Sequence, residues 1–167
     1  MKTIGILSDT HSFLHPKVLD FFKDVDEIWH AGDFGNIETV ERLQKFKPLR
    51  GVFGNIDDTS VRHSFPQFNL FDIEDVKVLI THIGGYPEHY FASALDVIRK
   101  EKPNIFVAGH SHILKIINDK PHQLLFINPG AAGIYGIHDR ITCVRFTIEG
   151  KDFHNMEVFE TKKTLNV

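Results

Sequence analysis

Short apolar runs alternate with polar loops and amphipathic segments through the first third of the chain. Residues 3–8 form an apolar run, and residues 16–25 then place apolar side chains at helical spacing. The same order recurs at residues 27–30 and 37–46, and a third apolar run spans residues 49–53. Strands that alternate with helices of about ten residues are typical of βαβ units. The pattern therefore predicts a buried, largely parallel sheet at the start of the fold.

The pattern changes in the second part of the chain. Residues 68–73 and 76–81 are consecutive strand-like runs joined by Glu74 and Asp75, which predicts a hairpin. A helix is expected over residues 90–102. Further strands are expected at residues 105–108, 113–117, 123–127, 141–148 and 153–160. With no linker, repeat or low-complexity segment, these elements predict two packed sheets with helices outside, in one domain over residues 1–167.

Composition narrows the class of protein. The chain is 42% hydrophobic and 25% charged, as in an ordinary globular domain. The net charge of -3, without any basic run, argues against binding of extended nucleic acid. Cys143 is the only cysteine, so an intramolecular disulfide and a thiolate metal cluster are excluded and a cytoplasmic setting is favoured. The run Met1–Leu7 is too short for a signal sequence or a membrane span, so we expect no membrane association.

Potential metal ligands follow five of the predicted strands. They lie in the segments Asp9-Thr10-His11, Gly32-Asp33, Gly54-Asn55, Thr81-His82 and Gly109-His110-Ser111-His112. Strand ends at one edge of an α/β sheet converge in space, so these side chains are expected to meet in one crevice. If the first and last segments are extended, alternation places both of their ligands on one side. A lone Asp-x-His more often caps a turn, but five such junctions together predict a metal site.

This set of motifs resembles that of the calcineurin-like metallophosphoesterases, in particular a small branch of bacterial and archaeal phosphodiesterases. The resemblance covers residues 4–146 and includes the segment Asn128-Pro129-Gly130. It implies an α/β fold of four layers (αββα), with two mixed sheets flanked by helices and metals at the strand ends. It also implies two divalent ions, one held by Asp9, His11, Asp33 and His112, the other by Asp33, Asn55, His82 and His110. Asp33 would bridge the ions and act with Asn55 in catalysis, and Asn55 and His82 would also bind substrate.

The ligand types suit this chemistry. Imidazole, carboxylate and carboxamide groups form a mixed nitrogen and oxygen site that suits Mn, Fe, Ni, Co or Zn and suits Ca poorly, and Mn is our first choice. Only Asp9 and Asp33 among the ligands carry charge, so two divalent ions leave a local positive charge that attracts phosphate. A pair of such ions lowers the pKa of a shared water and clamps the phosphoryl oxygens, so no protein nucleophile is required.

One position departs from the family pattern, and two residues near the ligands have supporting roles to assign. Ile56 stands where many relatives have a histidine that protonates the leaving group, so that acid is missing. Asp57 is expected either to act as a catalytic acid or ligand-orienting group, or to cap a turn. His30, shortly before Asp33, is expected to support a ligand.

Two loops are candidates for shaping substrate access. Residues 84–90 and 131–139 are either plain surface loops or part of the substrate site, and the second loop carries Tyr135 and His138. The sequence leaves both readings open.

The function that these residues predict is hydrolysis of small phosphate esters. Phosphodiesters rank ahead of monoesters because of the resemblance and because Ile56 supplies no acid for alkyl leaving groups. The alternative is a non-catalytic, metal-binding scaffold for protein interaction, a use that a eukaryotic retromer subunit makes of this fold. The complete ligand set argues against it. Oligomerisation stays open, since the phenylalanine-rich segment 65–71 suits either core packing or self-association.

Overall fold

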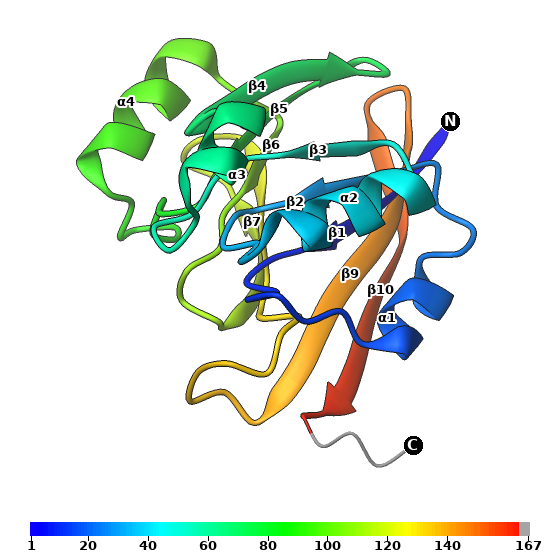
Figure 1. Cartoon of the computed structure of the whole chain (residues 1–167). Helices are drawn as coiled ribbons and strands as arrows, with labels where there is room; N and C mark the ends of the chain where they lie inside the picture. Colours follow the sequence, from blue (N-terminus) through cyan, green and yellow to red (C-terminus); the bar gives the residue numbers. More distant parts are fainter. Residues whose placement is uncertain (164–167) are drawn as a thin grey trace.

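The computed structural model describes residues 1–163, which form two five-stranded sheets packed face to face with helices on their outer faces (Figure 1). The first sheet has the order β10-β9-β1-β2-β3, with bounds β1 (Lys2–Leu7), β2 (Glu27–His30), β3 (Leu49–Gly51), β9 (Arg140–Glu149) and β10 (Asp152–Lys162). The second has the order β4-β5-β6-β8-β7, with bounds β4 (Phe68–Ile73), β5 (Val76–Thr81), β6 (Ile105–Val107), β7 (Leu114–Asp119) and β8 (Leu124–Pro129). The helices are α1 (Pro16–Phe21), α2 (Ile37–Phe46), α3 (Thr59–Ser64) and α4 (Ala92–Glu101).

Each sheet is mixed, with three parallel strands at its centre or edge. Strands β1, β2 and β3 run parallel, while β9 pairs antiparallel with both β1 and β10. In the second sheet β5, β6 and β8 are parallel, and β4 and β7 are antiparallel. The early pattern predicted a largely parallel sheet, but only β1, β2 and β3 of the first sheet are parallel. Strands β9 and β10, from the end of the chain, complete that sheet with antiparallel pairing. The four-layer α/β fold implied by the resemblance is confirmed.

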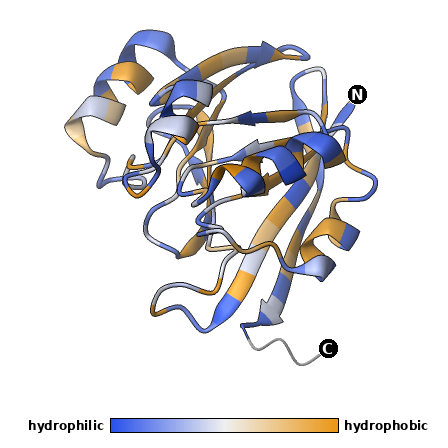
Figure 2. Ribbon diagram, viewed as in Figure 1, coloured by the Kyte–Doolittle hydropathy of each residue, from blue (hydrophilic) through white to orange (hydrophobic). Residues whose placement is uncertain are grey.

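Three apolar clusters hold the layers together. The cluster between the sheets includes Trp29, Ile80 and Phe146, all without solvent exposure. A second cluster packs α1, α2 and α3 on the first sheet, and a third packs α4 on the second. Figure 2 shows apolar and polar residues mixed along α2, whose Val40 and Leu43 are buried. Fully excluding such side chains from water contributes roughly 1.5–3 kcal/mol each.

The segment 65–71 belongs mainly to these clusters. Phe65 is buried on the outer face of the first sheet, and Phe68 and Phe71 pack against the other two clusters. Leu70 alone of its large apolar residues is markedly exposed, at 40%. Core packing therefore accounts for the phenylalanines of this segment.

Two helices begin directly after loops that carry candidate ligands. The side chain of Asn36 caps α2 by accepting the Thr39 N–H at 3.1 Å. The Asp58 carboxylate caps α3 by accepting the N–H groups of Ser60 and Val61. Such caps satisfy N–H groups that have no partner within the helix. They thereby anchor the far end of each ligand loop.

Candidate metal centre

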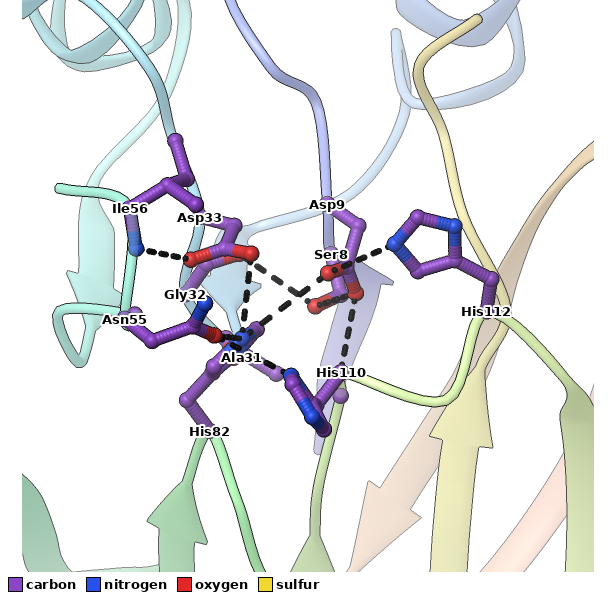
Figure 3. A network of polar contacts seen from close by, with 12 residues as sticks. Ser8, Asp9, Ala31, Gly32, Asp33, Asn55, Ile56, His82, His110 and His112 are labelled. Atoms are coloured by element: carbon purple, nitrogen blue, oxygen red, sulfur yellow. Dashed lines mark hydrogen bonds and ion pairs between the residues drawn. The ribbon is translucent and has the colours of Figure 1, made fainter. Parts of the chain in front are cut away.

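The candidate ligands lie in the loops that follow parallel strands of both sheets (Figure 3). Asp9 and His11 follow β1, Asp33 follows β2 and Asn55 lies beyond β3. From the second sheet, His82 follows β5, and His110 and His112 lie beyond β6. Because the carboxyl ends of these strands share one edge of the sandwich, all seven side chains meet there.

The donor atoms form two adjoining groups. Asp9, His11 and His112 each offer an atom within 4.8 Å of the others, and so do Asp33, His82 and His110. The Oδ1 atom of Asn55 lies 3.0 Å from both His82 Nε2 and His110 Nδ1. The resemblance divides these residues in the same way but adds Asp33 to the first group as well, and their coordination of metal stays a prediction.

Asp33 lies between the two groups. Its Oδ2 atom is 3.2 Å from His82 Nε2 and 3.5 Å from His11 Nε2. Its Oδ1 atom accepts the N–H of Ile56 at 3.1 Å. One oxygen is therefore held by the backbone while the other faces imidazoles of both groups, as a bridging ligand requires.

Asp9 shows the same division of its oxygens. Oδ2 accepts the hydroxyl of Ser8 at 2.6 Å and the N–H of His110 at 3.1 Å. Oδ1 lies 3.2 Å from His112 Nε2 and 3.9 Å from the Nε2 atoms of His11 and His82. Yet it is buried and has no hydrogen-bond partner among residues 1–163.

A cation between these atoms would resolve this arrangement. Asp9 Oδ1 and His11 Nε2 are both buried without a hydrogen bond in the described chain, and such atoms are costly unless something coordinates them. Carboxylate and imidazole atoms that face one another at these distances suit a divalent ion between them. The donor set therefore fits the metal ions that the resemblance implies.

Neighbouring hydrogen bonds set the ring orientation of two histidines. His82 Nδ1 lies 2.7 Å from the carbonyl oxygen of Ala31 and so donates to it, which directs Nε2 at Asp33 and makes Nε2 the lone-pair atom of the neutral ring. Burial opposes the charged ring, but the contacts with Asp33 and Asp9 outweigh it and raise the pKa of His82, so a bound metal ion would replace the Nε2 proton. His138 Nε2 likewise donates to Gly133 O at 2.9 Å, so its Nδ1 is an acceptor. That acceptor lies 3.1 Å from His112 Nδ1, which leaves His112 Nε2 free to coordinate. A neutral ring with its Nε2 lone pair directed inward is the form that binds a metal.

The ligand backbone is unusual. Asp9, His11, Asp33, His110 and His112 all have positive φ, between 44° and 69°. Non-glycine residues adopt this left-handed region at a cost of order 1–3 kcal/mol, and such strain gathers at functional sites. The extended alternation predicted for the first and last ligand segments is therefore wrong, because each ligand lies on a tight turn that directs its side chain inward.

Two glycines allow the loops to approach closely. A Cβ atom on Gly54 would collide with the backbone and carboxylate of Asp33, and one on Gly109 would collide with Ser8 Oγ. Only glycine leaves room for these neighbours. The close approach brings the Asn55 and His110 loops against the first sheet.

Behind the ligands, His30 supports the loops after β1 and β2. Its Nδ1 atom accepts the Gly32 N–H at 3.1 Å, so Nε2 donates to Thr10 Oγ1 at 2.9 Å. The Thr10 hydroxyl in turn donates to Phe34 O at 3.0 Å, and the Phe34 ring stacks on His30. Complete burial lowers the pKa of His30 to about 3, so the ring stays neutral. Sequence reasoning anticipated a supporting role for His30 but not the part of Thr10.

Asp57 holds the ligand loops together. Its carboxylate accepts three backbone N–H groups, from Phe34 at 3.2 Å, Gly35 at 2.9 Å and Gly54 at 2.8 Å. Burial raises its pKa despite these donors, and only 3% of the side chain is exposed. Of the roles that the sequence left open, this geometry favours the turn-forming one, since both oxygens are engaged with backbone.

The loop after β8 reaches the centre as well. Besides the contact of His138 with His112, the ring of Tyr135 lies 5.0 Å from that of His11, centroid to centroid. Gly136, with φ of +120°, lets the loop lie against His112. Sequence reasoning named Tyr135 and His138 only as residues of an open loop, because nothing in the spacing indicates which ligand each one meets.

The site favours ionised carboxylates. Burial alone would raise the pKa of Asp9, but the approach of His112 and His82 and the hydrogen bond from Ser8 outweigh it and hold that pKa below its usual value. Burial opposes ionisation of Asp33 too, but its contact with His82 and the Ile56 N–H lower its pKa. Carboxylates must be deprotonated to bind a metal, so the environment prepares both groups for that role.

A sandwich of two mixed sheets with carboxylates, imidazoles and an amide gathered at the strand ends is the architecture of a metallophosphoesterase. Residues 1–151 match the calcineurin-like phosphoesterase superfamily domain, and the chain belongs to this superfamily. This membership confirms the resemblance seen in the motifs.

Individual relatives agree with this assignment. The chain is 29% identical over 146 residues to a probable metallophosphoesterase of Methanothermobacter thermautotrophicus, covering 81% of this chain and 80% of the relative. It is similar in structure to an archaeal phosphodiesterase, with a TM-score of 0.69, 23% identity and coverage of 94% and 99% of the two chains. It is also similar to zinc-complexed Vps29 of Entamoeba histolytica, with a TM-score of 0.72, 17% identity and coverage of 97% and 99%. At these identities the two structures show the fold alone.

No helix in residues 1–163 has the length and apolar character that crossing a membrane requires.

Proposed function

We propose that this protein is a phosphodiesterase that uses two divalent metal ions. The observation that carries the proposal is the pair of adjoining ligand groups with Asp33 facing both. Membership of the phosphoesterase superfamily supports hydrolysis of a phosphoric ester.

In this proposal the two ions share Asp33 and otherwise have different ligands. Asp9, His11, Asp33 and His112 would hold the first ion, and Asp33, Asn55, His82 and His110 would hold the second. When bound, the ions supply Lewis-acid polarisation of the phosphoryl oxygens and lower the pKa of the attacking water. Manganese is our first choice, and Fe, Ni, Co and Zn also suit these nitrogen and oxygen ligands.

The chain's own residues orient the reactants. Asn55 turns its Oδ1 atom toward two imidazoles, which leaves its amide N–H groups to donate to a phosphoryl oxygen. Ile56 follows it with 47% of its surface exposed, at the place where relatives carry an acid. Without a proton donor there, the enzyme favours substrates whose leaving group is stable as an anion.

Two cavities beside the ligands favour diesters over monoesters. One, of about 200 Å³, is bordered by Asn55, His82 and Arg62, and the other, of about 340 Å³, by His110 and the segment 83–91. Ile83 borders both. A phosphodiester carries two organic groups and can fill both cavities, whereas a monoester fills one.

Hydrolysis by metal-stripped protein tests the proposal. The protein is re-supplied in turn with Mn, Ni, Co or Zn and assayed on bis-p-nitrophenyl phosphate and p-nitrophenyl phosphate. We expect metal-dependent turnover with a preference for the diester, and loss of at least a hundredfold in Asp33→Asn. The control is Asp72→Asn, which makes the same chemical change at an exposed position on β4 and should keep full activity. Preference for the monoester would refute the diesterase assignment.

The alternative, a non-catalytic metal-binding scaffold, draws support from a group of exposed apolar side chains near the centre. Ile113, Tyr135 and Ile137 are exposed at 56%, 69% and 102%. Exposed apolar groups of this kind mark many protein interaction surfaces. Metal binding by calorimetry without turnover of either ester would favour this alternative.

A further inference from the structure

The larger of the two cavities is lined by aromatic side chains. It is formed by the segment 83–91 after β5 and by Gly109, His110 and Ser111 after β6. Its volume of about 340 Å³ falls within the usual range for small-molecule sites, roughly 300–1,000 Å³. Because His110 belongs to the candidate ligand set, a group in this cavity lies directly beside the proposed phosphate position.

The cavity is built by an ordered loop. The N–H of Phe91 donates to Gly84 O at 3.1 Å, and the N–H of His89 donates to Tyr86 O at 2.8 Å. A Cβ atom on Gly84 would collide with the ring of Phe106, and one on Gly85 would collide with the backbone at His89. These two glycines let the loop fold down onto the second sheet, which creates the hollow.

One aromatic side chain anchors the loop while others face the cavity. The Tyr90 hydroxyl donates to buried Asp119 at 2.8 Å, and its ring packs on Phe106. Tyr86 and Phe91, by contrast, line the cavity and keep 38% and 52% of their surface exposed. Partly exposed aromatic rings beside a polar centre provide a stacking surface for a planar ligand.

A polar group in the same cavity adds a donor. Ser111 Oγ accepts the Asn128 Nδ2–H at 3.0 Å and the Ile113 N–H at 3.2 Å. Both of its lone pairs are thereby used, and its own O–H remains to donate. A planar ring with hydrogen-bond acceptors at its edge satisfies this donor, whereas a simple alkyl group does not.

The other cavity lacks this character. Its cation, Arg62, lies over the ring of Phe53 at 4.5 Å and donates to the carbonyl of Asp57. Phe53 is therefore already covered on that face. Tyr86 is also covered on one face, because the Lys115 ammonium lies 4.6 Å from its ring centroid, whereas no cation lies over Phe91 in the part of the chain that the structure describes. The two sides of the centre therefore differ in this second, uncovered aromatic ring.

We propose that the cavity lined by Tyr86 and Phe91 binds the nucleobase of a nucleotide whose phosphate lies at the metal ligands. The substrate class of the enzyme is then a phosphodiester that carries a nucleoside. This inference rests on the proposed function, because it places the phosphate at the two ions.

Calorimetric titration of the manganese-loaded protein with adenosine 5′-monophosphate and with ribose 5-phosphate tests the inference. The two ligands share a phosphate and a sugar and differ in the base. Released inorganic phosphate is measured in parallel to correct for turnover. Stacking on two rings predicts that the nucleotide binds roughly tenfold more tightly or better.

Two variants locate the effect. In Tyr86→Ala/Phe91→Ala the preference for the nucleotide should fall to about twofold or less, with ribose 5-phosphate binding unchanged. Val158→Ala, an exposed apolar position on β10, should keep the full preference.

Each contrary result has a distinct meaning. Equal affinity for the two ligands in the unaltered protein, or a preference that survives in the double variant, would overturn the nucleobase site while leaving the phosphodiesterase proposal intact. Failure of both ligands to bind, together with absent ester hydrolysis, would remove the phosphate site and the inference with it.

Discussion

Replacing Asp57 with asparagine separates a positioning role from a catalytic one. The carboxylate accepts three buried N–H groups, from Phe34, Gly35 and Gly54. The single carbonyl oxygen of asparagine can accept two of them, and its amide then faces the third. One buried N–H without an acceptor costs about 1–3 kcal/mol, which is a sizeable share of a total stability of roughly 5–15 kcal/mol.

The same substitution should weaken metal binding, because the three donors flank the ligands Asp33 and Asn55. Groups that hold ligands from behind typically contribute about 10–100-fold in metal affinity or activity. We therefore expect urea unfolding of Asp57→Asn to show the loss of stability, and metal titration of activity to show a midpoint raised about tenfold. With saturating metal, kcat should fall less than tenfold for every substrate.

Asp58→Asn is the matched control. Asp58 caps α3 by accepting two backbone N–H groups, and asparagine caps helices equally well. Its stability and metal midpoint should stay near those of the unaltered protein. An Asp57→Asn variant of normal stability, whose kcat fell ~10²-fold or more only for esters with poor leaving groups, would refute the positioning role and identify Asp57 as the acid.

Three further predictions concern the surroundings of the centre. His138→Ala should weaken manganese binding about tenfold in calorimetry, because His112 loses the acceptor that orients it, and unchanged affinity would contradict this role. The pKa of His30 is lowered from 6.5 to about 3, so the folded state binds fewer protons than the unfolded state between these values. The contribution of His30 to the free energy of unfolding is therefore fully present above about pH 6.5. It declines as the pH falls toward 3, by about 2 kcal/mol at pH 5. His30→Gln should reduce this decline in urea unfolding of metal-free protein at pH 7 and pH 5, and an unaltered decline would show that other groups cause it. Chelation should lower the Tm of the unaltered protein, because the ions bind only the folded state, and should change that of Asp33→Asn far less; equal shifts would place the metal elsewhere.

Much of the fold could be predicted from the sequence because local signals were strong. The helix at 37–46 and the hairpin strands 68–73 and 76–81 match the structure residue for residue, since clear periodicity and a short turn define them. Helix α3 was not predicted, because it is short and buries only Val61. The apolar run 49–53 is a strand only as far as Gly51, because the chain then turns toward Asn55.

In the candidate site, the ligands could be predicted from the sequence but the contacts that support them could not. The ligand types and their place at strand ends were readable from the chain, and the structure brings all seven together, although their coordination of metal stays a prediction. The supporting contacts were not readable. The contact between His138 and His112 joins residues 26 positions apart, and that between Asp57 and Gly35 joins loops of different strands. Such pairs depend on how the loops fold back, which no local pattern specifies.

The left-handed backbone at the ligands implies a trade-off, because residues that relieve the backbone strain would stabilise the fold but would remove a histidine ligand. Glycine or asparagine would occupy the turns at His11 and His112 with less strain than histidine does. A laboratory selection for heat resistance in metal-free medium should therefore enrich such replacements, each gaining on the order of 1 kcal/mol while erasing a ligand. The most thermostable variants from such a selection would therefore lack activity. Engineering this protein for higher stability requires selection for turnover and thermal stability together, with the ions present.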